Sequence, residues 1–135
     1  MEAIILAGGL GTRLRSVIND VPKPMATVAG RPFLDYILHY LKTQGISKVI
    51  LSVGYKSEII TDWYSDKNNA FELDISYSFE SEPLGTGGAI FKAAELVENE
   101  AFFIINGDTS FEVNLRELKT FSGQKGADIA IALRR

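Results

Sequence analysis

Apolar runs that fit buried strands recur along the chain, and segments with apolar residues at helical spacing separate them. The strand-like runs lie at 3–7, 48–53, 75–79, 102–105 and 127–133. The helical segments start at 33, 57, 86 and 115, and the first of them stops before Gly45, a typical position for a helix C-terminal glycine. Ser57 is the expected N-cap of the second helix. This alternation predicts an α/β fold with a mainly parallel sheet, helices on both faces and right-handed crossovers.

Composition limits the class of protein further. The chain has 135 residues, of which 46% are hydrophobic and 23% charged, as in a single compact domain. It contains no cysteine, which excludes disulfides, thiol nucleophiles and thiolate metal sites. With 14 Lys and Arg against 17 Asp and Glu and no basic cluster, we expect no nucleic-acid partner. The first apolar run is too short for a bilayer span or a signal peptide, so we expect no membrane contact and a cytoplasmic location.

Four polar segments are candidates for chemistry because each follows a strand or belongs to the long loop after the first strand. Ligands of parallel α/β sheets bind at the carboxyl ends of the strands. The loop from Gly8 to Pro32 also exceeds the usual strand-to-helix connection of about 2–6 residues, and such loops are usually functional or mobile. The candidate segments are 8–13, 22–24, 80–88 and 106–108.

The first segment has the composition of a triphosphate cradle. Gly8, Gly9 and Gly11 remove side chains where backbone N–H groups would approach phosphate oxygens. Thr12 adds a hydroxyl donor and Arg13 a permanent cation. The alternative interpretation is a glycine-rich turn with an exposed arginine.

Two common phosphate-binding motifs do not fit this loop. A Walker A loop needs Lys and then Ser or Thr after its last glycine, whereas Thr12-Arg13 follows Gly11. A dinucleotide fingerprint needs a third glycine where Leu14 stands. Any phosphate site here therefore belongs to another class.

Lys23 and Asp108 are the charged candidates in the other segments. Pro22 and Pro24 restrict the backbone on both sides of Lys23 and so aim its ammonium group, which would offset charge developing on a phosphorus. Asp108 follows an apolar strand and Gly107, and Mg²⁺ favours one or two carboxylates together with phosphate oxygens. The alternatives are a stiffened surface loop and a turn-capping aspartate.

Taken together, the motifs resemble the signature of the sugar-1-phosphate nucleotidyltransferases. The matching segments are residues 6–14 (LAGGLGTRL), 22–25 (PKPM), 82–89 (EPLGTGGA) and 106–108 (NGD), in the order of the family. The similarity is greatest to the guanylyltransferases for D-glycero-D-manno-heptose 1-phosphate and mannose 1-phosphate. It implies a Rossmann-like nucleotide-diphospho-sugar transferase fold.

The resemblance also implies roles for individual residues. Arg13 would engage the phosphates and the departing pyrophosphate, Lys23 would orient phosphate oxygens, and Asp108 would hold Mg²⁺. Glu80 and the Gly85-Thr86 turn would read the base. The residues that would wrap the nucleotide are Leu6, Ala7, Gly8, Gly9, Gly11 and Thr12.

The chemistry of Glu80 favours guanine. A carboxylate accepts both N1–H and the N2 amino group of guanine, whereas uracil offers one N–H and adenine mixes a donor with an acceptor. Glu80 could equally point to solvent and leave the base to backbone groups, and a uridylyltransferase or another base specificity stays an alternative.

The implied reaction joins a nucleoside triphosphate to a sugar 1-phosphate and releases pyrophosphate, so the expected partners are these small molecules, with a homo-oligomer left open. The family carries a second metal carboxylate and most sugar-contacting residues in a later segment, which has no counterpart here. We therefore expect residues 1–135 to be the nucleotide-binding portion of a single nucleotidyltransferase domain, incomplete at its C-terminus. The alternative is a non-catalytic nucleotide-binding module.

Overall fold

A computed structural model describes residues 1–9, 21–65, 71–110 and 112–133. The strands are β1 (Glu2–Leu6), β2 (Thr27–Val28), β3 (Arg31–Pro32), β4 (Lys48–Val53), β5 (Asp74–Phe79) and β6 (Phe103–Asn106). The helices are α1 (Phe33–Thr43), α2 (Ser57–Trp63), α3 (Gly85–Ala94) and α4 (Leu115–Lys125), with a 3-10 turn, η2, at Lys23–Met25. No helix in these described ranges is long and apolar enough to cross a bilayer.

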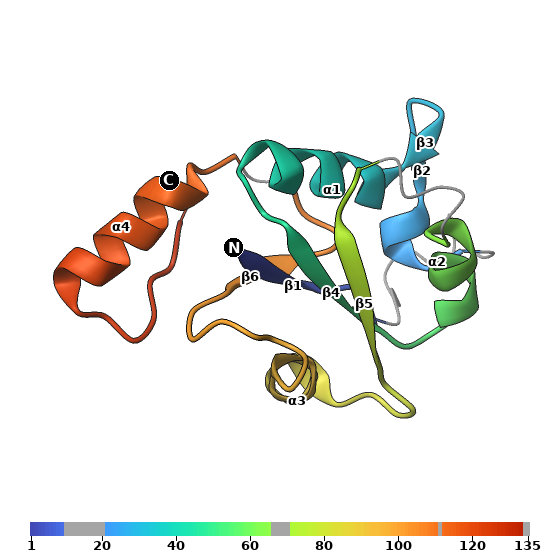
Figure 1. Ribbon diagram of the computed structural model, residues 1–135. Coiled ribbons are helices and arrows are strands. Elements are labelled where there is room, and N and C mark those ends of the chain that lie inside the picture. Colours follow the sequence, from blue (N-terminus) through green and yellow to red (C-terminus); the bar gives the residue numbers. More distant parts are fainter. Residues whose placement is uncertain (10–20, 66–70, 111, 134–135) are drawn as a thin grey trace.

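The main sheet is parallel and has the strand order β5-β4-β1-β6. The chain moves outward from β1 to β4 and β5, then returns past β1 to add β6 on the other side. Right-handed crossovers in opposite directions place their helices on opposite faces of a sheet. Accordingly α1 covers one face and α3 the other (Figure 1). The predicted α/β fold with a parallel sheet and helices on both faces is confirmed.

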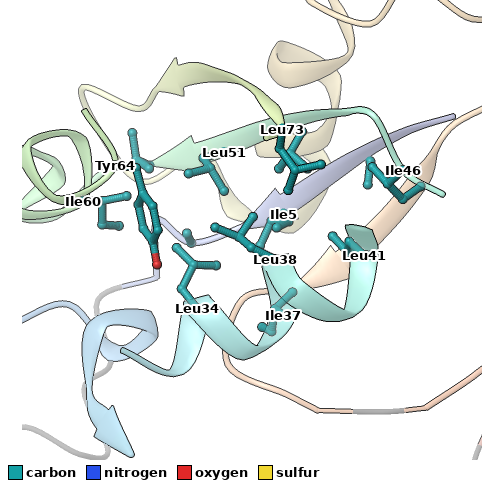
Figure 2. Close-up of a cluster of buried hydrophobic side chains, with 14 of the residues drawn as sticks. Ile5, Leu34, Ile37, Leu38, Leu41, Ile46, Leu51, Ile60, Tyr64 and Leu73 are labelled. Carbon is teal, nitrogen blue, oxygen red and sulfur yellow. The ribbon is translucent and has the colours of Figure 1, made fainter. Parts of the chain in front are cut away.

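The side chains of β1 alternate between these two helix layers. Ala3 and Ile5 join the larger core cluster under α1, whereas Ile4 packs with Ile50 of β4 and Ala93 of α3. Figure 2 shows the larger cluster between α1 and the sheet. Its labelled residues are Ile5, Leu34, Ile37, Leu38, Leu41, Ile46, Leu51, Ile60, Tyr64 and Leu73. A strand enclosed in this way has no polar face, which explains its continuous apolar run.

The prediction of a strand over 127–133 is wrong, because the structure forms no strand there. Gly126 ends α4 with a φ of 58°, and the Ala127 N–H donates to the Ser122 carbonyl at 3.1 Å. This helix-ending turn sends the chain back along α4 (Figure 1). Ile131 is 74% exposed. An alternating apolar pattern needs a neighbouring strand to pair with, and the described residues supply none here.

Two connections between the elements also differ from what the sequence predicted. Ser57 is not an N-cap but the first residue of α2, because Lys56 occupies the cap with a φ of 52°. The long loop contains a small hairpin of β2 and β3, which the sequence analysis did not predict. The hairpin turns at Ala29 and Gly30, whose φ values of 49° and 86° fit the primed turns that two-residue hairpins prefer.

A buried carboxylate holds the amino end of β1, opposite the end where ligands bind. Glu2 is 2% exposed and accepts hydrogen bonds from the backbone N–H of Asn99 at 2.7 Å and of Glu98 at 3.1 Å. The Lys48 ammonium lies 3.6 Å away on the paired strand. Burial acts to raise the pKa of Glu2, but the hydrogen bonds from Asn99 and Glu98 and the charge of Lys48 outweigh it and lower the pKa.

The lowered pKa predicts a stability loss in acid. The ionised Glu2 stabilises the fold above its ordinary pKa of 4.5, and this contribution disappears as the pH falls from there through the folded-state pKa. Glu2→Gln should lower the free energy of unfolding at pH 7 by about 1–3 kcal/mol and flatten its pH dependence below 4.5. Urea unfolding across this pH range measures both effects. Glu100→Gln, an exposed change in the same loop, should alter neither.

Candidate functional site

The candidate site lies where the strand order reverses, at the carboxyl ends of β1 and β6. β4 and β5 add to one side of β1 and β6 adds to the other. In open parallel α/β sheets, ligands bind at the carboxyl end of such a reversal point. The segments after β1 and β6 are Ala7–Gly9 and Gly107–Asp108, so topology alone brings two of the predicted segments together.

Gly107 makes this approach unusually close. Its backbone N–H donates to the Leu6 carbonyl at 2.9 Å. A Cβ atom at position 107 would lie 2.8 Å from that same carbonyl oxygen, a distance that side chains do not tolerate. Glycine therefore lets the chain leaving β6 stay against the end of β1, and it sets Asp108 beside that end.

The structure joins Lys23 and Asp108, which are 85 residues apart in sequence. Their Nζ and Oδ2 atoms are 2.5 Å apart, and the side chains are 36% and 38% exposed. Pro22 precedes the η2 turn in an extended conformation, and Pro24 is buried within it, so the backbone that carries Lys23 is fixed. The immediate partner of this lysine is a carboxylate.

Lys23 lowers the pKa of Asp108. Its hydrogen bond to the carboxylate outweighs partial burial, which acts to raise the pKa. The Thr109 hydroxyl assists by donating to the other carboxylate oxygen, Oδ1, at 3.1 Å. The surroundings of Asp108 thus favour its ionised form.

The Glu80 carboxylate is directed at the end of β1 and not to open solvent. Its Oε1 accepts a hydrogen bond from the Ser52 hydroxyl at 3.0 Å, and its Oε2 accepts one from the Leu84 backbone N–H at 3.2 Å. A Cβ atom on Gly8 would lie 2.5 Å from Oε1. Glu80 therefore joins the ends of β1, β4 and β5 to the entrance of α3.

The other predicted nucleotide-binding residues occupy different environments. Ala7 is 2% exposed and belongs to the core, so only its backbone is available to a ligand. Leu6 is half-buried, and Gly9 is exposed, with no atom of the described residues within 4 Å of the place a Cβ would take. Gly85, with a φ of 68°, and Thr86 form the exposed start of α3. The predictions for Gly11, Thr12 and Arg13 lie outside the described residues.

Sequence reasoning missed Ser52 and the N–H of Leu84. The available signal for Ser52 was one hydroxyl in the otherwise apolar core of β4, KVILSV. No sequence signal identifies the Leu84 N–H, because its role follows from the turn before α3. Within the described ranges no group of three or more His, Cys, Asp or Glu side chains forms a ready metal cage, so Asp108 stands as a single carboxylate candidate.

The close approach of the Glu80 carboxylate to Gly8 predicts an effect on stability. In Gly8→Ala the new methyl group would push the Glu80 carboxylate off its hydrogen bonds to Ser52 and Leu84. We expect the free energy of unfolding to fall by about 1–3 kcal/mol. In Gly9→Ala the new methyl group meets no atom of the described residues within 4 Å, so this variant is the matched control and should change the free energy of unfolding by less than about 0.5 kcal/mol.

A double-mutant cycle measured by urea unfolding identifies the cause. With Glu80→Ala already present, Gly8→Ala should lower the free energy of unfolding by a smaller amount, because the clashing carboxylate is gone. If Gly8→Ala lowers the free energy of unfolding equally in both backgrounds, the Glu80 carboxylate does not lie beside Gly8 in solution.

Comparisons with known proteins agree with this architecture. D-glycero-alpha-D-manno-heptose 1-phosphate guanylyltransferase of Campylobacter jejuni is 54% identical over 119 residues, which cover 88% of this chain and 52% of the relative. Mannose-1-phosphate guanylyltransferase of Mycobacterium tuberculosis is 38% identical, with 98% of this chain and 37% of the relative covered. The chain thus spans about half the length of the heptose enzyme that it matches.

The structural neighbours give the same picture. HddC from Yersinia pseudotuberculosis, solved in complex with GMP-PN, has a TM-score of 0.82 and 45% identity, covering 90% of this chain and 53% of that one. UDP-glucose pyrophosphorylase, at 21% identity and a TM-score of 0.74, shares the fold. The model of the nucleotidyl transferase family matches residues 2–134. The chain therefore belongs to the nucleotidyl transferase family, as its motifs predicted.

Proposed function

We propose that the protein transfers GMP from GTP to a sugar 1-phosphate of the heptose type, giving a GDP-sugar and pyrophosphate. The observation that carries this proposal is the Lys23–Asp108 pair at the carboxyl ends of β1 and β6. It sets one cation and one ionised carboxylate beside a glycine-rich backbone, as a triphosphate with its metal requires. The names of the relatives and the GMP-PN complex of HddC support the choice of guanine.

The proposed step is an in-line displacement. An oxygen of the sugar phosphate forms a bond to the α-phosphorus of GTP, while the bond from that phosphorus to the oxygen bridging to the β-phosphate breaks. The electron pair leaves with pyrophosphate, so no protein nucleophile is required. Positioning two substrates in this way can supply about 7–11 kcal/mol of the barrier reduction.

Each described residue has a part that its environment supports. The N–H groups of Gly8 and Gly9 are the candidates for phosphate contact, because Gly9 is exposed and carries no side chain. Asp108 is the residue that would hold Mg²⁺, and a bound Mg²⁺ would neutralise phosphate charge. Its single carboxylate fits a metal that takes its other ligands from water and phosphate. With a cation held by Asp108, the Lys23 ammonium would be free to contact phosphate oxygens. Arg13 keeps the role that the resemblance implies.

The Glu80 carboxylate retains capacity for the base. A carboxylate offers about four acceptor sites on its two oxygens. The Ser52 hydroxyl and the Leu84 N–H occupy two of them. The remaining sites suit the adjacent N1–H and N2–H donors of guanine, and Gly85-Thr86 follows on the same turn.

The activity test is pyrophosphate release from GTP, Mg²⁺ and D-glycero-D-manno-heptose 1-phosphate or mannose 1-phosphate. Asp108→Asn keeps the shape of the side chain but removes its charge, so the Mg²⁺ concentration for half-maximal GTP binding should rise about tenfold or more. Asp128→Asn, in the exposed segment after α4, is the control and should leave the titration unchanged. An unchanged titration in Asp108→Asn would remove Asp108 from the metal site. GTP binding without turnover would instead favour a nucleotide-binding module.

Base selection is tested at Glu80. In Glu80→Gln an amide NH₂ would face a guanine donor, and an unmatched buried donor costs about 1–3 kcal/mol, so the preference for GTP over UTP should fall about tenfold. Competition binding with GTP, UTP and ATP measures the order of preference. Glu82→Gln, an exposed neighbour, is the matched control. If the order survives in Glu80→Gln, the backbone of Gly85-Thr86 selects the base.

A further inference from the structure

We propose that Ser52 is a specificity-determining positioning residue, which fixes the Glu80 carboxylate so that it matches guanine. This inference rests on the proposed guanine selection and deepens it. Ser52 is 0% exposed, so its hydroxyl does not reach a ligand that binds from solvent. Any effect of Ser52 on the base must therefore pass through Glu80.

Ser52 carries a buried hydroxyl inside the sheet. It lies on β4 between two paired strands, opposite Leu6 of β1 and Ser78 of β5. Its side chain donates to Glu80 Oε1 at 3.0 Å, and no other described residue accepts from it. A buried hydroxyl is costly without a partner, and an alanine would satisfy the packing of this strand. The hydrogen bond to Glu80 gives this buried hydroxyl its partner, whereas the buried hydroxyl of Ser78 on β5 has none among the described residues.

Two donors on two different oxygens fix the orientation of a carboxylate. The last side-chain torsion angle of glutamate, χ3, has a broad distribution. The plane of a carboxylate that is held at one oxygen can therefore rotate. Ser52 holds Oε1 and the Leu84 N–H holds Oε2. The absence of a Cβ on Gly8 leaves room for Oε1 in this position. Without the Ser52 hydroxyl, the Leu84 N–H is the one contact of this carboxylate that remains among the described residues.

The consequence differs between bases. Guanine presents N1–H and the N2 amino group to two coplanar acceptor sites, so a rotated carboxylate loses one of the two bonds. Uracil presents one N–H and tolerates the rotation. Inosine triphosphate has N1–H but lacks the N2 amino group, and therefore reports the second bond separately.

The test compares Ser52→Ala with Ser78→Ala in the full chain. Ser78 is a suitable control because it is 4% exposed, lies opposite Ser52 in the register, and has a hydroxyl that bonds to no other described residue. Calorimetric titration gives the Kd values of GTP, ITP and UTP in the presence of Mg²⁺. We expect Ser52→Ala to reduce the GTP/UTP and GTP/ITP preferences about fivefold, which corresponds to one hydrogen bond. Ser78→Ala should keep both ratios.

These ratios separate positioning from a purely structural role, because partial loss of folding weakens all three nucleotides equally. In a Glu80→Gln background Ser52→Ala should produce no further change in the GTP/UTP ratio. Should Ser52→Ala fail to fold, Ser52→Thr and Ser52→Val provide a pair of similar shape, of which the threonine alone should keep the preference.

Unchanged ratios in Ser52→Ala, beside a wild-type chain that prefers GTP, would overturn this inference and leave the proposed guanine selection intact. A wild-type chain without any GTP preference would contradict the guanine assignment itself, and this inference with it. The two failures are thus distinguishable by the wild-type measurement alone.

Discussion

The enclosure of β1 is the constraint on which the rest of the structure depends. The strand has hydrogen-bonded neighbours on both edges and a helix layer on both faces, so its interior positions admit only apolar side chains. Polar chemistry can enter only where the strand ends. At its carboxyl end the strand is followed by Gly8 and Gly9, which have no side chains. Gly107 packs directly against the Leu6 carbonyl there. The site is therefore backbone at its centre, with charged side chains arriving from the neighbouring segments.

Among the described residues, Glu80 and Asp108 bring carboxylates to this edge of the sheet, and the structure satisfies the two differently. Asp108 is paired with the Lys23 ammonium, which lowers its pKa. Glu80 is held by the neutral hydroxyl of Ser52 and the N–H of Leu84. An ion-paired carboxylate can exchange one cation for another, whereas a carboxylate oriented by neutral donors keeps acceptor sites in fixed directions. These properties match the metal and base roles that we propose for them.

Much of the architecture could be predicted because it depends on local patterns. The continuous apolar runs identified β1 and β4, and the helical spacing before Gly45 identified α1. The strand predicted over 127–133 failed because alternation specifies a face and not a pairing partner. The β2–β3 hairpin was missed because its strands of two residues are too short to show any period.

In the candidate site, too, single residues could be predicted from the sequence but their contacts could not. Gly8, Lys23, Glu80 and Asp108 could be named as candidates from the sequence because they are chemically distinctive and follow strand ends or belong to the loop after β1. Their partners could not be, because the Lys23–Asp108 pair spans 85 residues and forms only through the strand order. The role of Ser52 similarly depends on its neighbour across the sheet, which a linear pattern does not contain.

The central claim is that nucleotide binds at the carboxyl ends of β1 and β6, where the strand order reverses. Backbone amide NMR shifts of the chain, recorded as GTP and Mg²⁺ are added, test it most directly. The account predicts the largest changes at residues 8–9, 80–86 and 107–108, with little change at Ser47 and Asn99 near the opposite end of the strands. Dominant changes at that opposite end, or no saturable changes at 8–9 and 107–108, would contradict it.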